Sequence, residues 1–391
     1  MEWVQKLALM APEGTRFEEE AYHQGPSPSL ALVKELASSI TSVSVPGRGR
    51  MNVLKAMMTS ICSRNCNYCG FRAGRDCERA SFTPQEMADG FFRLYRANLV
   101  EGLFLSSGIK GTGARAQDEI IATADILRHR LGYRDYLHLK IMPGAEKEQV
   151  QRTMELANRV SINLEAPTPK HLQPIAPRKE HSQLEQPLEW MAKIREDKGW
   201  RVPSLATQFV VGPGGESDQD LLVSAQRLHT ELGLRRVFFS PFNPIKDTPL
   251  ENETPTPPIR QHRLYQGAYL LRDYNFEVKE LPFSKQGFLP DRLDPKLAWA
   301  NQYLSYDPVE VNRESRWRLL RVPGIGPVGA ERILRERRRG TLQSLEDLRK
   351  IGVHVSRAAP YITMDGNRPP FQLPLGIPDA EEDSHSDHED R

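Results

Sequence analysis

Three cysteines lie close together in the first quarter of the chain. Cys62, Cys66 and Cys69 are separated by three and then two residues, and Cys77 is the fourth and last cysteine. A disulfide framework spreads its cysteines along a chain, whereas clustered thiols are typical of a metal site. Three thiolates on one loop can hold three irons of a [4Fe-4S] cluster and leave the fourth iron without a protein ligand. Such an open iron can bind a substrate or a cofactor.

A structural zinc site is the main alternative for these thiols. Cys77 could act as the fourth ligand, and no histidine lies between His23 and His129. The separation of Cys77 from Cys69 is unusual for a zinc site. The polar residues between the thiols argue against a third interpretation, in which the cysteines are buried members of the core. We therefore predict an iron-sulfur cluster held by Cys62, Cys66 and Cys69.

The elements that would position this loop follow an alternating pattern. Short apolar, β-branched runs alternate with longer stretches of helical period, as in parallel βα units. Crossovers between parallel strands are right-handed, so six such units curl into a barrel with helices outside and the chemistry at the strand C-termini. A doubly wound open sheet has the same local pattern. We predict an α/β fold, a partial (β/α)6 TIM-like barrel, with strands at residues 53–59, 102–106, 136–142, 160–165, 205–212 and 236–241.

The cysteine spacing, with Tyr68 directly before the last cysteine and the first strand before the loop, resembles the radical S-adenosylmethionine (SAM) superfamily. In that family the open iron binds the amine and carboxylate of S-adenosyl-L-methionine. The reduced cluster cleaves it to a 5'-deoxyadenosyl radical, which removes a hydrogen from the substrate. The resemblance implies a [4Fe-4S] cluster and S-adenosylmethionine as cofactors, and a reduced flavodoxin or ferredoxin as electron donor.

Glycine and serine residues after two other predicted strands extend the resemblance. Ser106, Ser107 and Gly108 follow the second strand and are similar to the motif that binds the methionyl amine, although Gly-Gly-Glu is commoner there. Gly212 opens a glycine-rich turn after the fifth strand, similar to the turn beside the adenine. By itself such a turn could follow any strand.

Polar residues alternate along the fourth predicted strand. Ser161 and Asn163 are similar to the polar pair that faces the ribose in that family, and strand alternation places Glu165 on the same face. That face should line the barrel lumen. The resemblance further implies that Tyr68 packs beside the adenine.

A turn rich in glycine and proline lies near the C-terminus. It contains Pro323, Gly324, Ile325 and Gly326 and separates two stretches of helical period. Residues 313–350 hold eleven basic and five acidic residues, among them Arg332 and Arg335. Free amides at a helix start together with arginines favour a phosphate. The turn resembles the helix-hairpin-helix motif, and residues 345–353 resemble the start of a second copy. The alternative is a helical pair with solvated arginines.

A radical SAM barrel joined to a helix-hairpin-helix module resembles a bacterial group of radical SAM proteins described as DNA modification or repair proteins. This kinship implies a uracil-DNA-glycosylase-like partner. Our first hypothesis is an enzyme that modifies or repairs a base or sugar in DNA. RNA is the alternative substrate, because backbone contacts do not separate the two nucleic acids. A non-catalytic nucleic-acid-binding protein stabilised by metal is the third hypothesis.

Length and charge bound the remaining organisation. The chain has 391 residues, a net charge of +2 and a mean hydropathy of −0.55, with no apolar run long enough to span a membrane. We expect a cytoplasmic protein without membrane contact. Residues 379–391 hold seven acids and one base. The expected division is an extension (1–50), the barrel (51–275), a bridging segment (276–315), the helix-hairpin-helix module (316–358) and a disordered acidic tail (359–391).

Overall fold

The computed structural model describes residues 2–10, 39–45, 49–198 and 203–371. The chain divides into two compact units, the first formed by residues 1–272 and 276–295 and the second by residues 273–275 and 296–391. The acidic run at residues 379–391 and residues 11–38 of the expected N-terminal extension lie outside the described residues. No helix in the described residues is both long and apolar enough to cross a membrane.

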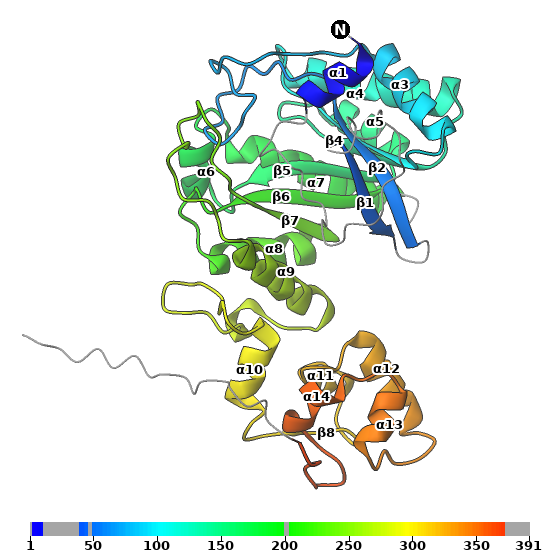
Figure 1. Ribbon diagram of the computed structural model, residues 1–391, viewed down its shortest axis with the longest axis vertical. Coiled ribbons are helices and arrows are strands. Elements are labelled where there is room, and N and C mark those ends of the chain that lie inside the picture. The colour runs from blue at the N-terminus through cyan, green and yellow to red at the C-terminus, as the bar shows by residue number, and fades with distance from the viewer. Residues whose placement is uncertain (1, 11–38, 46–48, 199–202, 372–391) are drawn as a thin grey trace, which may run out of the picture. The chain divides into compact units, whose positions relative to one another are not determined.

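A seven-stranded sheet forms the centre of the first unit (Figure 1). Its strands follow one another in chain order, and β2 to β7 are parallel while β1 runs antiparallel to β2. The six parallel strands confirm the predicted α/β half-barrel. The strands are β1 (Ile40–Val45), β2 (Gly49–Met57), β3 (Gly102–Ser106), β4 (Tyr136–Lys140), β5 (Arg159–Glu165), β6 (Ser204–Val211) and β7 (Arg236–Pro241).

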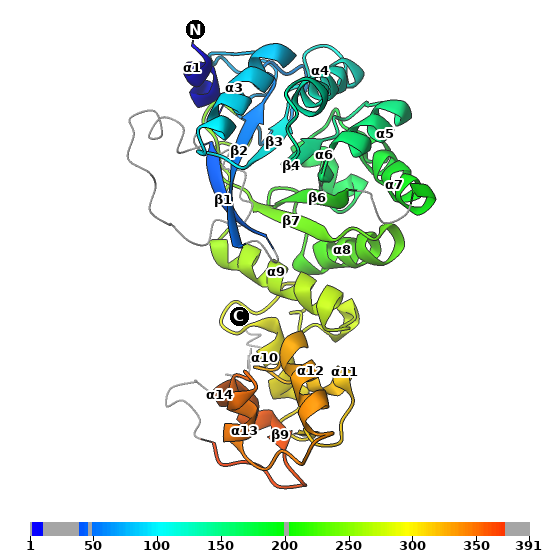
Figure 2. The ribbon, with the colours of Figure 1, turned by 90° about the vertical axis from the view of Figure 1, so that its right-hand side faces the viewer.

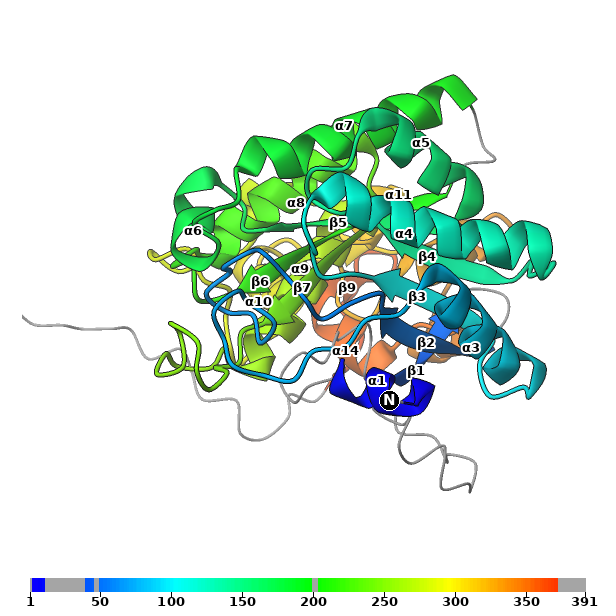
Figure 3. The same ribbon diagram turned by 90° about the horizontal axis from the view of Figure 1, so that it is seen from above.

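Helices lie on the outer side of this curled sheet (Figures 2 and 3). Right-handed crossovers place a helix between successive parallel strands, as expected for βα units. The helices are α1 (Trp3–Leu9), α3 (Pro84–Arg96), α4 (Gly113–Asp125), which continues into a π-helical turn (Ile126–Arg130), α5 (Lys147–Leu156), α6 (Pro169–Ile175), α7 (His181–Lys198), α8 (Asp218–Leu232), α9 (Pro258–Asp273) and a 3-10 turn (Val278–Glu280).

Helix α3 shows how the local sequence sets an element's start. The side chain of Thr83 accepts a hydrogen bond from the amide of Glu86, and the carboxylate of Glu86 accepts one from the amide of Thr83. This capping box, with Pro84 in the first turn, satisfies donors that a helix N-terminus leaves free. The helix therefore begins at Pro84.

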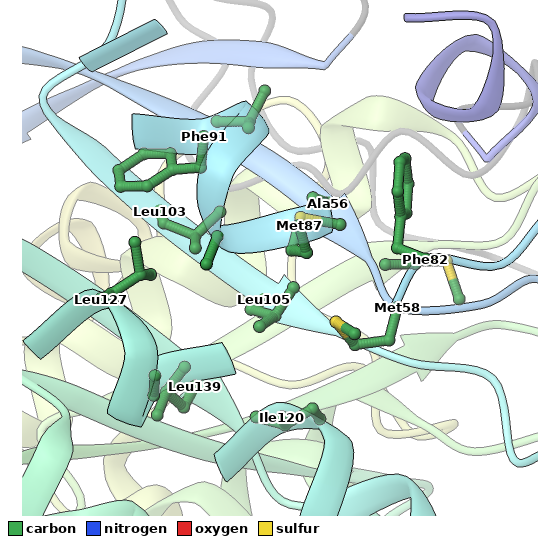
Figure 4. Packing of buried hydrophobic residues seen from close by; sticks show 14 of the residues in the cluster. Ala56, Met58, Phe82, Met87, Phe91, Leu103, Leu105, Ile120, Leu127 and Leu139 are labelled. Carbon is green, nitrogen blue, oxygen red and sulfur yellow. The ribbon is translucent and has the colours of Figure 1, made fainter. Parts of the chain in front are cut away.

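The main core lies between the sheet and helices α3 and α4 (Figure 4). Leu103 and Leu105 of β3 meet Phe91 of α3 and Ile120 of α4, and each of these side chains is fully buried. Since every residue of β3 is buried, this strand lies inside the sheet with both of its faces covered. The core therefore fixes the strands whose C-terminal ends carry the candidate site.

Two predicted boundaries of the barrel differ from the structure. Residues 40–45 and 49–50 are part of the sheet, because β1 pairs with β2 from Ile40 opposite Leu54 to Val45 opposite Gly49. Residues 276–295 of the expected bridging segment belong to the first unit. The amide of Leu289, for example, donates to the Asp218 carboxylate at 3.0 Å.

The second unit is mainly helical. Leu319, Leu320, Ile325 and Ile333 are buried in its core, so apolar residues in and on either side of the glycine-rich turn face inward. Its elements are α10 (Pro295–Tyr303), β8 (Val309–Glu310), α11 (Arg316–Leu319), α12 (Pro327–Glu336), α13 (Leu345–Lys350), α14 (Val355–Ala358), a 3-10 turn (Ala359–Tyr361) and β9 (Ile362–Thr363).

Residues 316–358 hold helices and no strand, but the expectation that a disordered tail begins at residue 359 is wrong. Strands β8 and β9 form a two-stranded parallel sheet, in which Val309 lies opposite Ile362. Tyr361, Ile362 and Met364 are buried. The apolar residues after position 360 therefore close the second unit, and any tail must begin later than predicted.

Candidate functional site

The three cysteines lie on the loop that follows β2, at the edge of the sheet where the parallel strands end. Backbone hydrogen bonds join this loop to its neighbours. The amide of Ser63 donates to the carbonyl of Ile109 at 2.8 Å, and the amide of Asn67 donates to the carbonyl of Ile175 at 2.7 Å. The loop after β3 and the end of α6 therefore hold the cysteine loop from two directions.

Arg79 joins the two ends of the cysteine loop. Its guanidinium donates to the carbonyl oxygens of Ser60 at 2.7 Å, Phe71 at 2.9 Å, Arg72 at 3.0 Å and Arg75 at 3.1 Å. One acceptor precedes the first cysteine of the motif and the other three follow its last. A planar guanidinium can make several such bonds at once, so one side chain closes the loop on itself.

The thiols are held in surroundings that disfavour free thiolates. Burial raises the pKa of Cys66, and burial with the neighbouring thiol of Cys66 raises the pKa of Cys69 to about 12. The amide of Phe71 donates to the sulfur of Cys69 at 3.4 Å. A metal centre supplies the positive charge that buried thiolates need, and it deprotonates the thiols that bind it. The donor set therefore fits a metal-thiolate group.

The fourth cysteine lies apart from the other three. In the described part of the chain no three His, Cys, Asp or Glu side chains form a group that could hold a metal ion. Cys77 is not among the cavity-lining residues, and its thiol lies 3.7 Å from the carbonyl of Gly70.

A cavity of about 1180 Å³, including its solvent-open part, lies at this edge of the sheet. It brings together most of the site residues that the sequence predicts. The predicted residues that line it are Cys62, Cys66, Tyr68, Cys69, Ser106, Ser107, Gly108, Asn163 and Glu165.

Gly108 lies where the loops after β2 and β3 touch. Its amide donates to the carbonyl of Thr59 at 2.7 Å. A Cβ atom on this residue would lie 2.5 Å from the carbonyl oxygen of Ile61 and 2.9 Å from that of Thr59. Only glycine allows so close an approach of two backbones. The glycine of the predicted Ser-Ser-Gly motif therefore sets the position of the cysteine loop.

Glu165 and Lys179 form a buried ion pair in the cavity wall. Their charged atoms are 2.8 Å apart, and the side chains are 4% and 10% exposed. Burial would raise the pKa of Glu165, but the ammonium groups of Lys179 and Lys140 outweigh it and lower the pKa. The hydroxyl of Tyr68 hydrogen-bonds to Glu165, and the amide of Asn163 donates to it at 3.4 Å. Tyr68 is thus tied to the carboxylate.

Ser161 lies deeper than the other predicted residues of β5. It lines a smaller hollow below the main cavity, together with Asn163, which lines both. The hydroxyl of Ser161 is 2.8 Å from the Nε2 atom of His138. Burial, with the nearby cations of Arg159 and Lys140, holds the pKa of His138 well below its usual value. This imidazole is therefore neutral near pH 7.

Gly212 does not line the cavity. Its φ is +114°, and its amide donates to the carboxylate of Glu216. A Cβ atom here would lie 2.2 Å from the hydroxyl oxygen of Thr256. The glycine is needed for the turn after β6 to pass Thr256, and the structure gives it a place in the backbone away from the other predicted residues.

Several cavity residues were missed by the sequence analysis. Lys140 ends β4 and Gln208 lies within β6, so strand alternation could have identified both once the lumen face was known. Lys179 lies after α6, fourteen residues beyond its partner Glu165, and no spacing signal indicates that pair. The missed residues that line the cavity include Arg64, Lys140, Lys179, Gln208, Ser240 and Asn243.

The glycine-rich turn of the second unit joins α11 to α12. Gly324 has φ +83°, a conformation that favours glycine, and the amide of Ile325 donates to the carbonyl of Val322 at 3.1 Å. The side chains of Pro323 and Ile325 are buried, so they shape the turn. We call residues 322–326 the first hairpin.

A second turn of similar sequence joins α13 to α14 and packs on the first hairpin. Gly352 also has φ +83°, and the amide of His354 donates to the carbonyl of Gly324 at 3.1 Å. Arg332, predicted to bind nucleic acid, donates to the carbonyl of Ile351 at 2.9 Å and so joins α12 to this second turn. Arg335 is exposed and lies 3.3 Å from the carboxylate of Glu336.

The first hairpin turns its carbonyls inward and leaves amides without acceptors. The carbonyl of Gly326 accepts from the amide of Ala330, which begins the bonding of α12. Over the described residues, the amides of Gly324, Gly326, Val328 and Gly329 have no acceptor within the protein. Unused amides at a helix start, with the helix dipole behind them, form a site suited to an anion.

A family model described as the radical SAM superfamily matches residues 57–228, the segment that carries the cysteine loop and the strands β3 to β6. This segment of the chain is therefore similar to the radical SAM superfamily. Members of that superfamily use a [4Fe-4S] cluster and S-adenosylmethionine. No curated protein matches the chain significantly.

Solved structures resemble the chain over about half of its length. HydG, a maturase of the [FeFe]-hydrogenase, is 13% identical with a TM-score of 0.46, covering 56% of this chain and 49% of its own. Methylornithine synthase (PylB) is 13% identical with a TM-score of 0.45, covering 56% and 61%. A radical SAM methyltransferase from Sphaerobacter thermophilus is 14% identical with a TM-score of 0.44, covering 56% and 64%. The match spans less than two thirds of each of these proteins.

Proposed function

We propose that this protein is a radical SAM enzyme that modifies or repairs a base or sugar in DNA. The proposal depends on one observation above all. A cavity lined by three thiols belongs to the same chain as a hairpin and helix start with four unused amides. The first is suited to the cofactors of the superfamily, and the second is suited to the backbone of a nucleic acid.

In the cavity, Cys62, Cys66 and Cys69 would hold the cluster. When reduced and with S-adenosylmethionine bound, the cluster would supply the electron for cleavage of S-adenosylmethionine to a 5'-deoxyadenosyl radical. Ser107 and Asn163 offer hydrogen-bonding groups to the cofactor from the ends of two strands. The side chains of this wall are already tied to one another, so the cavity is preorganised for its ligand.

In the second unit, the first hairpin and the start of α12 would bind a phosphate of the nucleic-acid backbone. Arg335 adds attraction that depends on salt. We propose that this arrangement is a helix-hairpin-helix module with the second turn as its companion. A base in a duplex must leave the stack to enter a cavity, at a cost of a few kcal/mol, so backbone contacts beside it would help to hold the strand.

The resemblance of the whole chain supports two partners. We propose a reduced flavodoxin or ferredoxin as the electron donor, because the superfamily's reaction begins with reduction of the cluster. We propose a uracil-DNA-glycosylase-like protein as the associated partner, since the related bacterial group implies it.

The test is an anaerobic reaction. The protein is reconstituted with iron and sulfide, reduced, and given S-adenosylmethionine with DNA, with RNA or with neither, and 5'-deoxyadenosine is measured. We expect formation that DNA stimulates more than RNA. Cys66→Ala should abolish it, whereas the matched variant Cys77→Ala should retain it, because Cys77 is not among the cavity-lining residues.

Each outcome separates the hypotheses. Stimulation by RNA over DNA would replace the proposed substrate. Reconstituted and reduced protein that forms no 5'-deoxyadenosine would favour a non-catalytic nucleic-acid-binding protein, in which the metal only stabilises the fold.

A further inference from the structure

A lysine is buried beneath the first hairpin. Lys296, in the first turn of α10, is 9% exposed, and its Nζ atom donates to the carbonyl oxygen of Ile325 at 2.7 Å. The same ammonium lies 4.5 Å from the centre of the Tyr274 ring. Lysine is seldom buried, because removing its charge from water is unfavourable unless that charge has partners. Its position therefore calls for a physical role.

Three other carbonyls of the first hairpin accept from backbone amides. Val322 accepts from Ile325, Gly324 from His354 and Gly326 from Ala330. The carbonyl of Ile325 instead accepts from a side chain. A charged donor makes a stronger hydrogen bond than a neutral one, so this carbonyl is held firmly in the direction of the lysine.

The peptide bond between Ile325 and Gly326 links that carbonyl to the ligand side of the hairpin. The peptide unit is planar and trans, so its C=O and N–H point in opposite directions. Fixing the carbonyl of Ile325 toward Lys296 therefore fixes the amide of Gly326 away from it. That amide is one of the four without an acceptor among the described residues.

We propose that Lys296 is a positioning residue for anion binding by the first hairpin. Its ammonium orients the Ile325–Gly326 peptide so that the Gly326 amide faces the bound phosphate, and it places a positive charge behind that amide without touching the phosphate. This inference rests on the proposed nucleic-acid binding of the second unit. In this proposal a residue outside the hairpin orients the hairpin for anion binding.

The experiment measures binding of a short DNA duplex by the full-length protein over a series of salt concentrations. Lys296→Met should weaken binding about tenfold or more, the effect of losing a hydrogen bond to a charged group. The slope of log affinity against log salt should not change, because no phosphate contact is lost. Lys350→Met, which removes the same charge from an exposed position, is the matched control, and its effect should not exceed that of losing one surface charge.

Two further variants separate positioning from a role in folding. Lys296→Arg keeps a charged donor and should retain most of the affinity. Lys296→Ala leaves room for a small cation, so ammonium chloride in place of sodium chloride at equal ionic strength should restore part of the affinity. A role confined to packing would predict no such rescue.

The outcomes are distinct from those of the proposed function. If the wild-type protein does not bind DNA, the proposed function fails and this inference fails with it. If the wild-type protein binds and Lys296→Met, folded by circular dichroism, binds equally well, the inference alone is wrong. A salt slope lowered by about one in Lys296→Met would mean that the lysine contacts a phosphate directly, and would also overturn it.

Discussion

Glu165 occupies a backbone conformation that residues other than glycine seldom adopt. Its φ is +65°, and the pairing of β5 with β6 shifts register between Asn163 and Glu165. This irregularity turns the carboxylate toward Lys179 and Tyr68 at the end of the strand. Unusual backbone geometry persists where surrounding contacts hold it, and here the contacts belong to the cavity wall.

Breaking the Glu165–Lys179 pair from either side should destabilise the protein. Lys179→Met leaves a buried carboxylate without this partner, at an expected cost of about 3–5 kcal/mol. The double variant Glu165→Gln with Lys179→Met should recover part of that loss. Urea unfolding of the wild type, both single variants and the double variant measures the coupling. A loss of under about 1 kcal/mol in the single variant would contradict a buried pair.

The same pair predicts a pH dependence. The pKa of Glu165 in the folded protein lies below its ordinary value, since the nearby ammonium groups outweigh burial. The stabilisation is therefore complete above the unfolded value of about 4.3 and is lost as pH falls through the folded pKa. The difference in Tm between wild type and Glu165→Gln should shrink as pH is lowered from 7 toward that range. A constant difference would show that the carboxylate's charge is not responsible.

Arg79 offers a test of how the cysteine loop is held. Arg79→Lys keeps the charge, but one ammonium cannot replace the four carbonyl contacts of the guanidinium. We expect fewer than the roughly four irons per chain that a [4Fe-4S] cluster provides after reconstitution. Iron and sulfide analysis measures this. Arg96→Lys, on the exposed side of α3, is the control and should load fully.

Among the elements, short apolar strands bounded by turn residues were the most predictable. The strands at residues 102–106 and 236–241 have the predicted bounds, because turn residues flank short apolar runs on both sides. Strand β1 was missed although Ile40, Val43 and Val45 lie before a Pro-Gly pair, a pattern that indicates a hairpin. The π-helical turn after α4 was not predicted. Arg128 in this turn is buried and donates to the carbonyl of Leu156, a contact between residues distant in the chain.

Some residues of the candidate site could likewise be predicted from the sequence, and others could not. The cysteines and the polar ends of β3 and β5 were predicted because spacing and strand alternation are local signals. Arg79 and Lys179 were not, since each acts through contacts that only the folded chain creates. Gly212 was assigned to the cofactor from a turn pattern that does not distinguish a ligand-binding turn from a turn that passes close to a neighbouring side chain.

The contact between the loops after β2 and β3 can be tested through Gly108. In Gly108→Ala the new Cβ atom would meet backbone oxygens at 2.5 and 2.9 Å, which cannot move aside as a flexible side chain can. We expect a loss of about 1–3 kcal/mol in stability and weaker iron binding, measured by urea unfolding and iron analysis. Gly340→Ala, where no atom lies within 4 Å, should change neither. Full iron loading of Gly108→Ala would mean that the two loops move independently.

At the scale of the whole molecule, each unit carries one part of the proposed activity. The first unit holds the thiols and the cavity, and the second holds the hairpin and residues 313–350, where eleven basic residues outnumber five acidic ones. Phosphate contacts orient a nucleic acid without reading its sequence. Selection of a target therefore has to come from the cavity or from a partner.

This division predicts how salt affects DNA binding. Arg335→Ala should weaken binding similarly for unrelated sequences and lower the slope of log affinity against log salt by about one. Arg96→Ala, in the first unit, should leave the slope unchanged. The measurement is a salt titration of duplex binding by full-length protein. An effect of Arg335→Ala restricted to one sequence would indicate base contacts instead.

The cysteine loop is held by hydrogen bonds to Arg79, to the loop after β3 and to the end of α6, all of them within the polypeptide. The order of maturation follows from this. We expect the cysteine loop to be largely formed before iron arrives, so that the cluster binds to a preformed loop and the loop does not fold around it. A protease that cleaves exposed loops should then cut the freshly translated chain no faster in the cysteine loop than it cuts the matured enzyme.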